Sequence, residues 1–271
     1  MGPPAYRLWR AISQQESVKT QTLSPHVTPE QKRLYEEQGF FVMERVIPDE
    51  HLALLRRELA AAIDNIHKQM DEKQTDVLGI NHRNKRYFVT LFRETGRNAE
   101  FLFSDLLADI CRQTIGDTAY LFCEQYVVKA AEVGMQFSWH QDSGYVKQPH
   151  KPYVSCWCAL DDMSEENGTV YMLPYSRAGT KDRVEHVKDE KTNDFVGYHG
   201  DDLGDPVICP AGSIAVFSST CFHRSGFNRT DKPRRVYLAQ YSPEPILNKE
   251  GKPYICTEPF LKDGRRVREA R

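Results

Sequence analysis

The stretch FSWHQD, residues 137–142, places an imidazole and a carboxylate two residues apart in a segment with the pattern of a β-strand. Side chains of a strand alternate between its two faces, so we expect His140 and Asp142 to point the same way. A neutral imidazole and a hard carboxylate suit a first-row divalent ion such as ferrous iron better than calcium or magnesium. The stretch therefore predicts two of the three ligands of a metal site.

The third ligand is expected from a histidine far along the chain. His223 is the strongest candidate, because it follows the apolar run at residues 214–217, which has the pattern of a buried strand. Two histidines and one carboxylate on one face of an ion leave its other coordination positions open to small molecules. Such openness indicates catalysis rather than a structural metal site. We expect the other strand or loop histidines to have ordinary structural roles; these include His150, His186 and His199.

Composition narrows the function further. The chain has 271 residues, of which 40% are hydrophobic, and this is enough for a substantial core. A net charge of -2 argues against a broad surface for nucleic acid or anionic membranes, although the tail Lys262–Arg271 is locally basic and is expected to be a solvated end. The partner we expect is a small molecule, and oligomeric state is left open.

The cysteines and the apolar segments bear on the cellular compartment. Seven cysteines without a Cys-x-x-Cys pair are typical of reduced thiols in a cytoplasmic protein. The start of the chain lacks an apolar leader region, and no segment has the roughly 18 apolar residues of a membrane helix.

The chain is predicted to form a single catalytic domain over residues 1–271. Its expected parts are an N-terminal arm (1–26), a helical cap with the first strands (27–118), a jelly-roll core (119–243) and a C-terminal tail (244–271). Thr28, Pro29 and Gln31 form a helix-start signal, and that helix should end near Gly39. Further predicted helices begin after Pro48 and span 99–112, while residues 71–86 are expected to form a solvated loop.

The second half of the chain has the pattern of short strands separated by Gly, Pro, Asn and Asp. Predicted strands cover 40–43, 87–92, 119–129, 136–142, 154–160, 169–173, 206–209, 213–217 and 235–241. Strands that follow helices, rather than alternating with them, indicate an antiparallel fold. We therefore expect a mainly β protein with α-helices: a double-stranded β-helix, or jelly roll of the cupin kind, with N-terminal and flanking helices.

The order of the motifs resembles that of a known family. His140-Gln141-Asp142 is followed by His223 and, eleven residues later, by Arg234, and the segments Glu166–Val170 and His223–Thr230 add support. Across roughly residues 30–243 the chain is similar to the phytanoyl-CoA dioxygenase (PhyH) family of iron(II)/2-oxoglutarate-dependent oxygenases. One departure is Pro174-Tyr175-Ser176-Arg177, where the family commonly has Pro-Gly-Ser-His; this affects the adjacent loop and the substrate pocket rather than the metal ligands.

The resemblance implies a role for each matching residue. Fe(II) would be held by His140, Asp142 and His223, 2-oxoglutarate would chelate it as cosubstrate, and O2 would take the remaining position, with ascorbate as a stimulant. Arg234 would grip the distal carboxylate of 2-oxoglutarate. Ser225 matches a position that bonds the same carboxylate, and Gln125 and Trp157 match positions that line the cosubstrate pocket.

The implied reaction is hydroxylation of an unactivated C–H bond in a small-molecule substrate, resembling a secondary metabolite or a lipid, with release of succinate and CO2. Desaturation, epimerisation or cyclisation by the same iron-dependent oxidation stays open, and Asp142 disfavours halogenation because related halogenases have a small residue there. A non-catalytic metal-binding jelly roll, or one that uses zinc for hydrolysis, is the alternative from another class. The basic cluster Arg83–Arg86 is either solvated or attracts an anionic group of the substrate, and the long loop 176–205 is either a lid over the site or a mobile connection.

Overall fold

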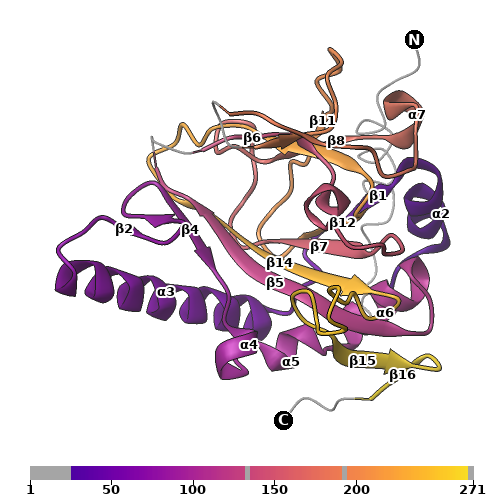
Figure 1. Ribbon diagram of the computed structural model, residues 1–271, viewed down its shortest axis with the longest axis horizontal. Coiled ribbons are helices and arrows are strands. Elements are labelled where there is room, and N and C mark those ends of the chain that lie inside the picture. The colour runs from indigo at the N-terminus through magenta and orange to yellow at the C-terminus, as the bar shows by residue number, and fades with distance from the viewer. Residues whose placement is uncertain (1–25, 132–134, 191–193, 268–271) are drawn as a thin grey trace, which may run out of the picture.

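The computed structural model describes residues 26–131, 135–190 and 194–267 (Figure 1). The predicted N-terminal arm lies outside the described residues except for His26. The helices of the described residues are α2 (Pro29–Gln38), α3 (Asp49–Glu72), α4 (Phe92–Thr95), α5 (Ala99–Leu102), α6 (Asp105–Thr114), α7 (Tyr175–Ala178) and the short 3-10 helix η1 (Asp142–Tyr145).

Local sequence signals determine the first two helices. The Thr28 hydroxyl accepts from the Gln31 N–H while the Gln31 side chain accepts from the Thr28 N–H, and α2 ends at Gly39 in the left-handed region, as predicted. Helix α3 begins after Pro48 and buries one apolar stripe that runs from Leu52 to Met70. The continuous helix predicted for 99–112 is wrong: Ser104 caps a new helix, α6, and separates it from α5.

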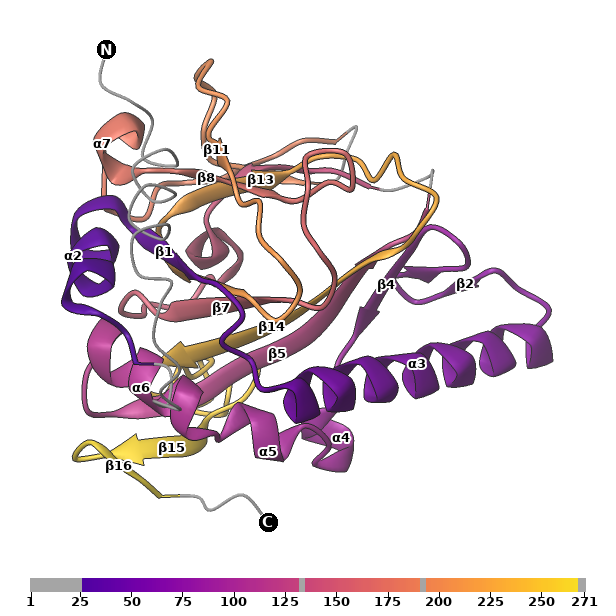
Figure 2. The ribbon, with the colours of Figure 1, turned by 180° about the vertical axis from the view of Figure 1, so that it is seen from behind.

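The strands form two facing antiparallel sheets, which Figures 1 and 2 show as two layers with the helices α3 to α6 on the outer side of the larger one. The large sheet has the order β1-β12-β7-β14-β5-β4-β3-β2, with β15 and β16 attached through β5, and the small sheet has the order β11-β8-β13-β6. A separate pair, β10-β9, lies in the loop between α7 and β11.

Strands β5 to β8 and β11 to β14 alternate between the two sheets in the manner of a double-stranded β-helix, so the predicted fold is confirmed. The strand bounds are β1 (Phe40–Met43), β2 (Val77–Leu78), β3 (Asn81–His82), β4 (Arg86–Val89), β5 (Ala119–Lys129), β6 (Phe137–His140), β7 (Val154–Ala159), β8 (Val170–Leu173), β9 (Val187–Lys188), β10 (Phe195–Val196), β11 (Asp205–Pro206), β12 (Ile214–Ser218), β13 (Phe222–Ser225), β14 (Arg234–Ser242), β15 (Glu258–Lys262) and β16 (Arg265–Arg266).

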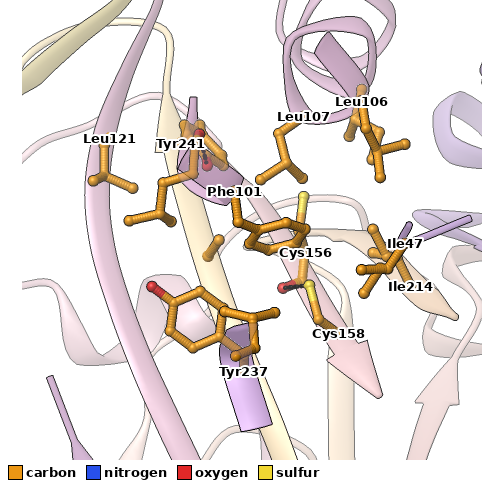
Figure 3. Packing of buried hydrophobic residues seen from close by; sticks show 14 of the residues in the cluster. Ile47, Phe101, Leu106, Leu107, Leu121, Cys156, Cys158, Ile214, Tyr237 and Tyr241 are labelled. Carbon is orange, nitrogen blue, oxygen red and sulfur yellow. Dashed lines mark hydrogen bonds between the residues drawn. The ribbon is translucent and has the colours of Figure 1, made fainter. Parts of the chain in front are cut away.

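Two buried clusters hold these layers together. The larger one packs α3, α5 and α6 against the outer face of the large sheet, where Phe101, Cys156 and Tyr237 meet (Figure 3). The second fills part of the space between the two sheets and includes Trp157, Phe217 and other apolar side chains. Because strand residues alternate in direction, β4, β5, β7, β12 and β14 of the large sheet contribute side chains to both the helix-facing core and the inner cavity.

The structure differs from the predicted elements at several places. Residues 71–86 include the hairpin β2–β3 instead of a plain loop, and its Arg83 forms ion pairs with Asp71 and Asp76. The strand predicted for 136–142 ends at His140, and His223 lies on its own strand, β13. The tail contains β15, which pairs with β5 and was not predicted.

Candidate metal centre

The three predicted metal ligands converge between the two sheets. His140 is the last residue of β6, Asp142 opens η1, and His223 lies opposite His140 in the β13–β6 pair. One ligand atom from each of the three side chains lies within 4.8 Å of the other two. Strand alternation explains only part of this convergence, because Asp142 reaches the site through the 3-10 turn and not as the next inward residue of a strand.

Backbone carbonyls orient both imidazoles. His140 Nδ1 lies 2.7 Å from the Ser138 carbonyl oxygen, and His223 Nδ1 lies 3.1 Å from that of Cys221. A carbonyl oxygen can only accept a hydrogen bond, so each Nδ1 carries a proton, and the neutral form of each ring has its free lone pair on Nε2. Both rings therefore present Nε2 as a potential metal ligand.

The carboxylate of Asp142 is held by two donors on its outer oxygen. The Ser155 hydroxyl donates to Oδ2 at 2.6 Å and the Gln240 amide donates to the same oxygen at 2.9 Å. The other oxygen, Oδ1, faces His223 Nε2 at 3.5 Å. This division leaves Oδ1 available for a cation, while Oδ2 fixes the orientation of the group.

The protonation states suit a metal site. Burial, reinforced by the nearby His223, lowers the pKa of His140 to about 3, so its imidazole is neutral. Burial alone would raise the pKa of Asp142, but polar neighbours, among them the Ser155 hydroxyl that donates to Oδ2, outweigh burial and hold the pKa below its usual value. A neutral imidazole and an ionised carboxylate are the forms that bind metal.

A cavity of about 500 Å³ opens beside the three candidate metal ligands. All four residues predicted to surround the cosubstrate line this cavity: Gln125, Trp157, Ser225 and Arg234. They come from β5, β7, β13 and β14, so both sheets contribute. As expected from strand alternation, Val236 and Leu238 share the inner face of β14 with Arg234, while Tyr237 and Tyr241 pack in the helix-facing core. The rest of the lining is mostly aromatic or aliphatic.

Arg234 is the strongest sign of an anionic ligand. Its side chain is only 2% exposed, and its Nη2 donates to the Gly168 carbonyl at 3.1 Å. Among the described residues, its Nε and Nη1 have no hydrogen-bond partner, and Arg234 forms no ion pair with a carboxylate. Buried donors without partners are costly, so this guanidinium fits a bound carboxylate. Its Cζ lies 5.7 Å from the centre of the Trp157 ring, within the range of a cation–π contact.

Several residues at this site were not predicted from the sequence to belong to it. Lys129 lies beside Ser225, and Ser155 and Gln240 hold Asp142. His186 Nε2 accepts from the Gln141 N–H next to the metal ligands, so this histidine supports the site. Strand parity could have revealed two of them, because Lys129 shares the face of Gln125 and Gln240 shares the face of Arg234.

The departure at residues 174–177 has a structural role of its own. Arg177, in place of the family histidine, forms ion pairs of 2.8 Å with Asp202 and Asp205. These contacts connect α7 with the end of the long loop 176–205. The change therefore concerns the loop and leaves the three candidate ligands unaffected.

Comparison with known proteins settles the family. The family model for phytanoyl-CoA dioxygenase (PhyH) matches residues 35–236. The chain belongs to the PhyH family. A "Phytanoyl-CoA dioxygenase domain-containing protein 1" of Danio rerio is 28% identical over 142 residues, which is 49% of this chain and 48% of that protein. Ectoine dioxygenase of Bordetella bronchiseptica is 24% identical over 248 residues, covering 82% of this chain and 78% of that protein.

Among solved structures, the non-heme alpha-ketoglutarate-dependent carbocyclase SnoK from nogalamycin biosynthesis has a TM-score of 0.64 at 17% identity, covering 91% of this chain and 98% of SnoK. This similarity supports the double-stranded β-helix fold. As a PhyH protein, the chain is an Fe(II)/2-oxoglutarate-dependent dioxygenase that uses Fe(II), 2-oxoglutarate and O2. Within the part of the chain that the structure describes, no helix is long and apolar enough to cross a membrane.

Proposed function

We propose that His140 Nε2, Asp142 Oδ1 and His223 Nε2 hold Fe(II), and that Arg234 with Ser225 holds the distal carboxylate of 2-oxoglutarate. On this proposal the enzyme hydroxylates an unactivated C–H bond of a small molecule with a largely apolar body. The observation that supports it most is the presence, in one cavity, of three convergent ligand atoms and a buried guanidinium with free donors.

When bound, Fe(II) and 2-oxoglutarate supply the activation of O2, with one oxygen atom going to succinate and the other to the substrate as CO2 leaves. The chain supplies orientation. Its two imidazoles and the carboxylate would hold the ion beside the cavity, where coordination positions not taken by the protein would be available to small molecules. Arg234 and Ser225 determine which way the cosubstrate lies, because a guanidinium binds a carboxylate through two parallel hydrogen bonds.

The cavity lining supports an uncharged, largely apolar substrate. Phe88, Phe122, Phe137, Tyr153 and Ile255 surround the space next to the metal ligands. Apart from the candidate ligands, the charged residues of the lining are Arg224 and Arg234, and the Arg224 guanidinium stacks on Tyr171 at 4.0 Å. Apolar walls also exclude water from the reacting carbon. These features favour a lipid-like or secondary-metabolite body over a small zwitterion.

The first test uses Arg234→Ala. We expect the variant to keep a normal Fe(II) content and to need at least tenfold more 2-oxoglutarate for half-maximal succinate formation, because the carboxylate loses its cationic partner. The measurements are iron content and succinate formation by protein supplied with Fe(II), ascorbate and 2-oxoglutarate. Loss of iron from the variant would instead give the arginine a structural role.

A second measurement decides between an enzyme and a binding module. Wild-type protein loaded with Fe(II) should form succinate slowly even without its principal substrate. Failure of metal-loaded protein both to form succinate and to bind 2-oxoglutarate would favour a non-catalytic metal-binding jelly roll. With candidate substrates of apolar character, a product mass gain of one oxygen atom supports hydroxylation, whereas a loss of two hydrogens or an unchanged mass supports desaturation, cyclisation or epimerisation.

A further inference from the structure

A second buried cation lies beside Arg234. Lys129 is fully buried at the end of β5 and is the direct cross-strand partner of Arg234 in the β14–β5 pair. Among the described residues, neither side chain forms an ion pair with a carboxylate; Asp194 and Asp161 act on them only over longer range. Two adjacent buried cations repel each other, so the pair favours an anion nearby.

The ammonium of Lys129 has three acceptors. It donates to the Ser225 hydroxyl oxygen at 2.8 Å, to the Gly168 carbonyl at 3.3 Å and to the Gly226 carbonyl. A neutral donor could also satisfy the two carbonyls. Burying a full positive charge is costly, so hydrogen bonds to the carbonyls alone do not account for a lysine at this position. The contact with Ser225 is the one that leads into the cavity, because Ser225 lines it and Lys129 does not.

The direction of the Ser225 hydrogen bond follows from the charge of its neighbour. An ammonium has no lone pair, so Ser225 Oγ must accept from Lys129, and its own O–H is free to donate elsewhere. Burial and the neighbouring Arg234 lower the pKa of Lys129, and a carboxylate bound at Ser225 and Arg234 would favour its charged form again. In that state the Ser225 hydroxyl donates into the cavity.

We infer that Lys129 is a positioning residue for the cosubstrate: it aims the Ser225 hydroxyl at the distal carboxylate of 2-oxoglutarate and places a second positive charge behind that hydroxyl. The inference rests on the proposed function. It adds a third member to the carboxylate subsite, and this member acts through Ser225 without touching the ligand. The Gly168 carbonyl, which accepts from both cations, holds Lys129 and Arg234 at the same corner of the cavity.

The test compares two 2-oxo acids under anaerobic conditions with Fe(II) bound. Both 2-oxoglutarate and 2-oxobutyrate have the same chelating end, but 2-oxobutyrate lacks the distal carboxylate. Their dissociation constants are measured from the visible charge-transfer absorption of the Fe(II) chelate. For Lys129→Met we expect the 2-oxoglutarate constant to rise at least tenfold, or about 1.4 kcal/mol, while the 2-oxobutyrate constant changes less than twofold.

A double-mutant cycle tests the path through Ser225. Ser225→Ala should also weaken the binding of 2-oxoglutarate while leaving that of 2-oxobutyrate nearly unchanged. The dissociation constant of the double variant for 2-oxoglutarate should be no more than about twofold above that of the single variant that binds it less tightly, because both changes remove the same interaction. Lys129→Gln, which keeps a hydrogen-bond donor but no charge, serves if Lys129→Met does not fold. Lys85→Met, at an exposed position beyond the site, is the control for loss of a lysine charge and should bind both acids normally.

Three outcomes would overturn the inference: equal weakening of the binding of both acids by the Lys129 variants, no weakening of the binding of either acid, or independent, multiplicative effects of Lys129 and Ser225. Failure of the proposed function looks different. In that case the wild-type protein itself would show no preference for 2-oxoglutarate, and Arg234→Ala would change neither dissociation constant.

Discussion

The Gly168 carbonyl accepts hydrogen bonds from both buried cations, and the backbone there tolerates only glycine. Its φ is +74°, and a Cβ would lie 2.5 Å from the Gly226 carbonyl oxygen. Left-handed backbone penalises any other residue, and the close approach of two chain segments adds a second penalty. The segment Glu166–Val170, which supported the family resemblance, therefore has a physical role beside the proposed carboxylate subsite.

Gly168→Ala should destabilise the protein more than Gly179→Ala. Both glycines have a φ of +74°, but no atom lies within 4 Å of a Cβ at Gly179. We expect Gly179→Ala to cost about 1–2 kcal/mol from the backbone alone. At Gly168 the contact with Gly226 should add about 1–3 kcal/mol.

Denaturant unfolding of both variants measures the difference. The Gly168→Ala variant should also bind 2-oxoglutarate less tightly, since the carbonyl that holds Arg234 must move. Equal destabilisation by the two changes would show that the contact with Gly226 is easily relieved.

Gln240→Leu should weaken Fe(II) binding without unfolding the protein. Gln240 donates to Asp142 Oδ2 and to the Ser155 hydroxyl, so its amide helps to fix the carboxylate proposed to bind the metal. Loss of a residue that orients a metal ligand typically reduces affinity about 10–100-fold. Anaerobic Fe(II) titration is the measurement, and Gln113→Leu on α6 is the control expected to bind normally. An unchanged affinity in Gln240→Leu would mean that Ser155 alone orients Asp142.

At the scale of elements, the C-terminal strand β15 extends the large sheet through β5. Phe260 of this strand is fully buried and packs against Phe103 and Tyr241. The sequence predicts a C-terminal tail over residues 244–271 and no strand in this segment. Its pairing with β5 depends on residues 119–121, more than 130 positions earlier, and no local signal reports that contact.

Phe260→Ala should therefore be strongly destabilising, by about 3–5 kcal/mol, because it opens a cavity in the helix–sheet core. Val267→Ala is the matched control: Val267 is half exposed, and its truncation should change stability by less than about 0.5 kcal/mol. The free energy of unfolding from urea titrations gives both values. A small effect at Phe260 would mean that β15 detaches easily from the sheet.

Other elements show where local signals were sufficient. Helix α2 and strand β5 have the predicted bounds, because a capping box and a long alternating strand are determined by adjacent residues. The break between α5 and α6 was missed, although Ser104 is a favourable cap, because the apolar spacing continues across it. The Ser104 side chain accepts from the Leu107 N–H and so begins a new helix at this point.

At the scale of the whole molecule, the candidate site joins the two sheets. His140 and His223 belong to the small sheet, whereas Arg234, Trp157 and Gln240 belong to the large one. A site built from both sheets exists only in the folded protein. Ligands that bind there should therefore stabilise the native state by mass action.

Fe(II) with 2-oxoglutarate, each at about 100 times its dissociation constant and without O2, should raise the melting temperature. The expected stabilisation from one such ligand is about 2.7 kcal/mol, which for a chain of this size corresponds to a shift of roughly 5–10 °C. Differential scanning calorimetry measures the shift, and Asp142→Ala should abolish the contribution of the metal. A wild-type protein whose melting temperature responds to neither ligand would contradict the proposed site.

The sequence by itself determined the fold class and the family, and it proposed which residues hold the metal and the cosubstrate carboxylate, because these inferences depend on residue types, their order and strand periodicity. Only the tertiary structure decided how Asp142 reaches the site through a turn, and which groups surround Lys129. The acceptors of Lys129 lie 39 to 97 positions away along the chain. Contacts of that range depend on how the two sheets face each other, and no local pattern contains that information.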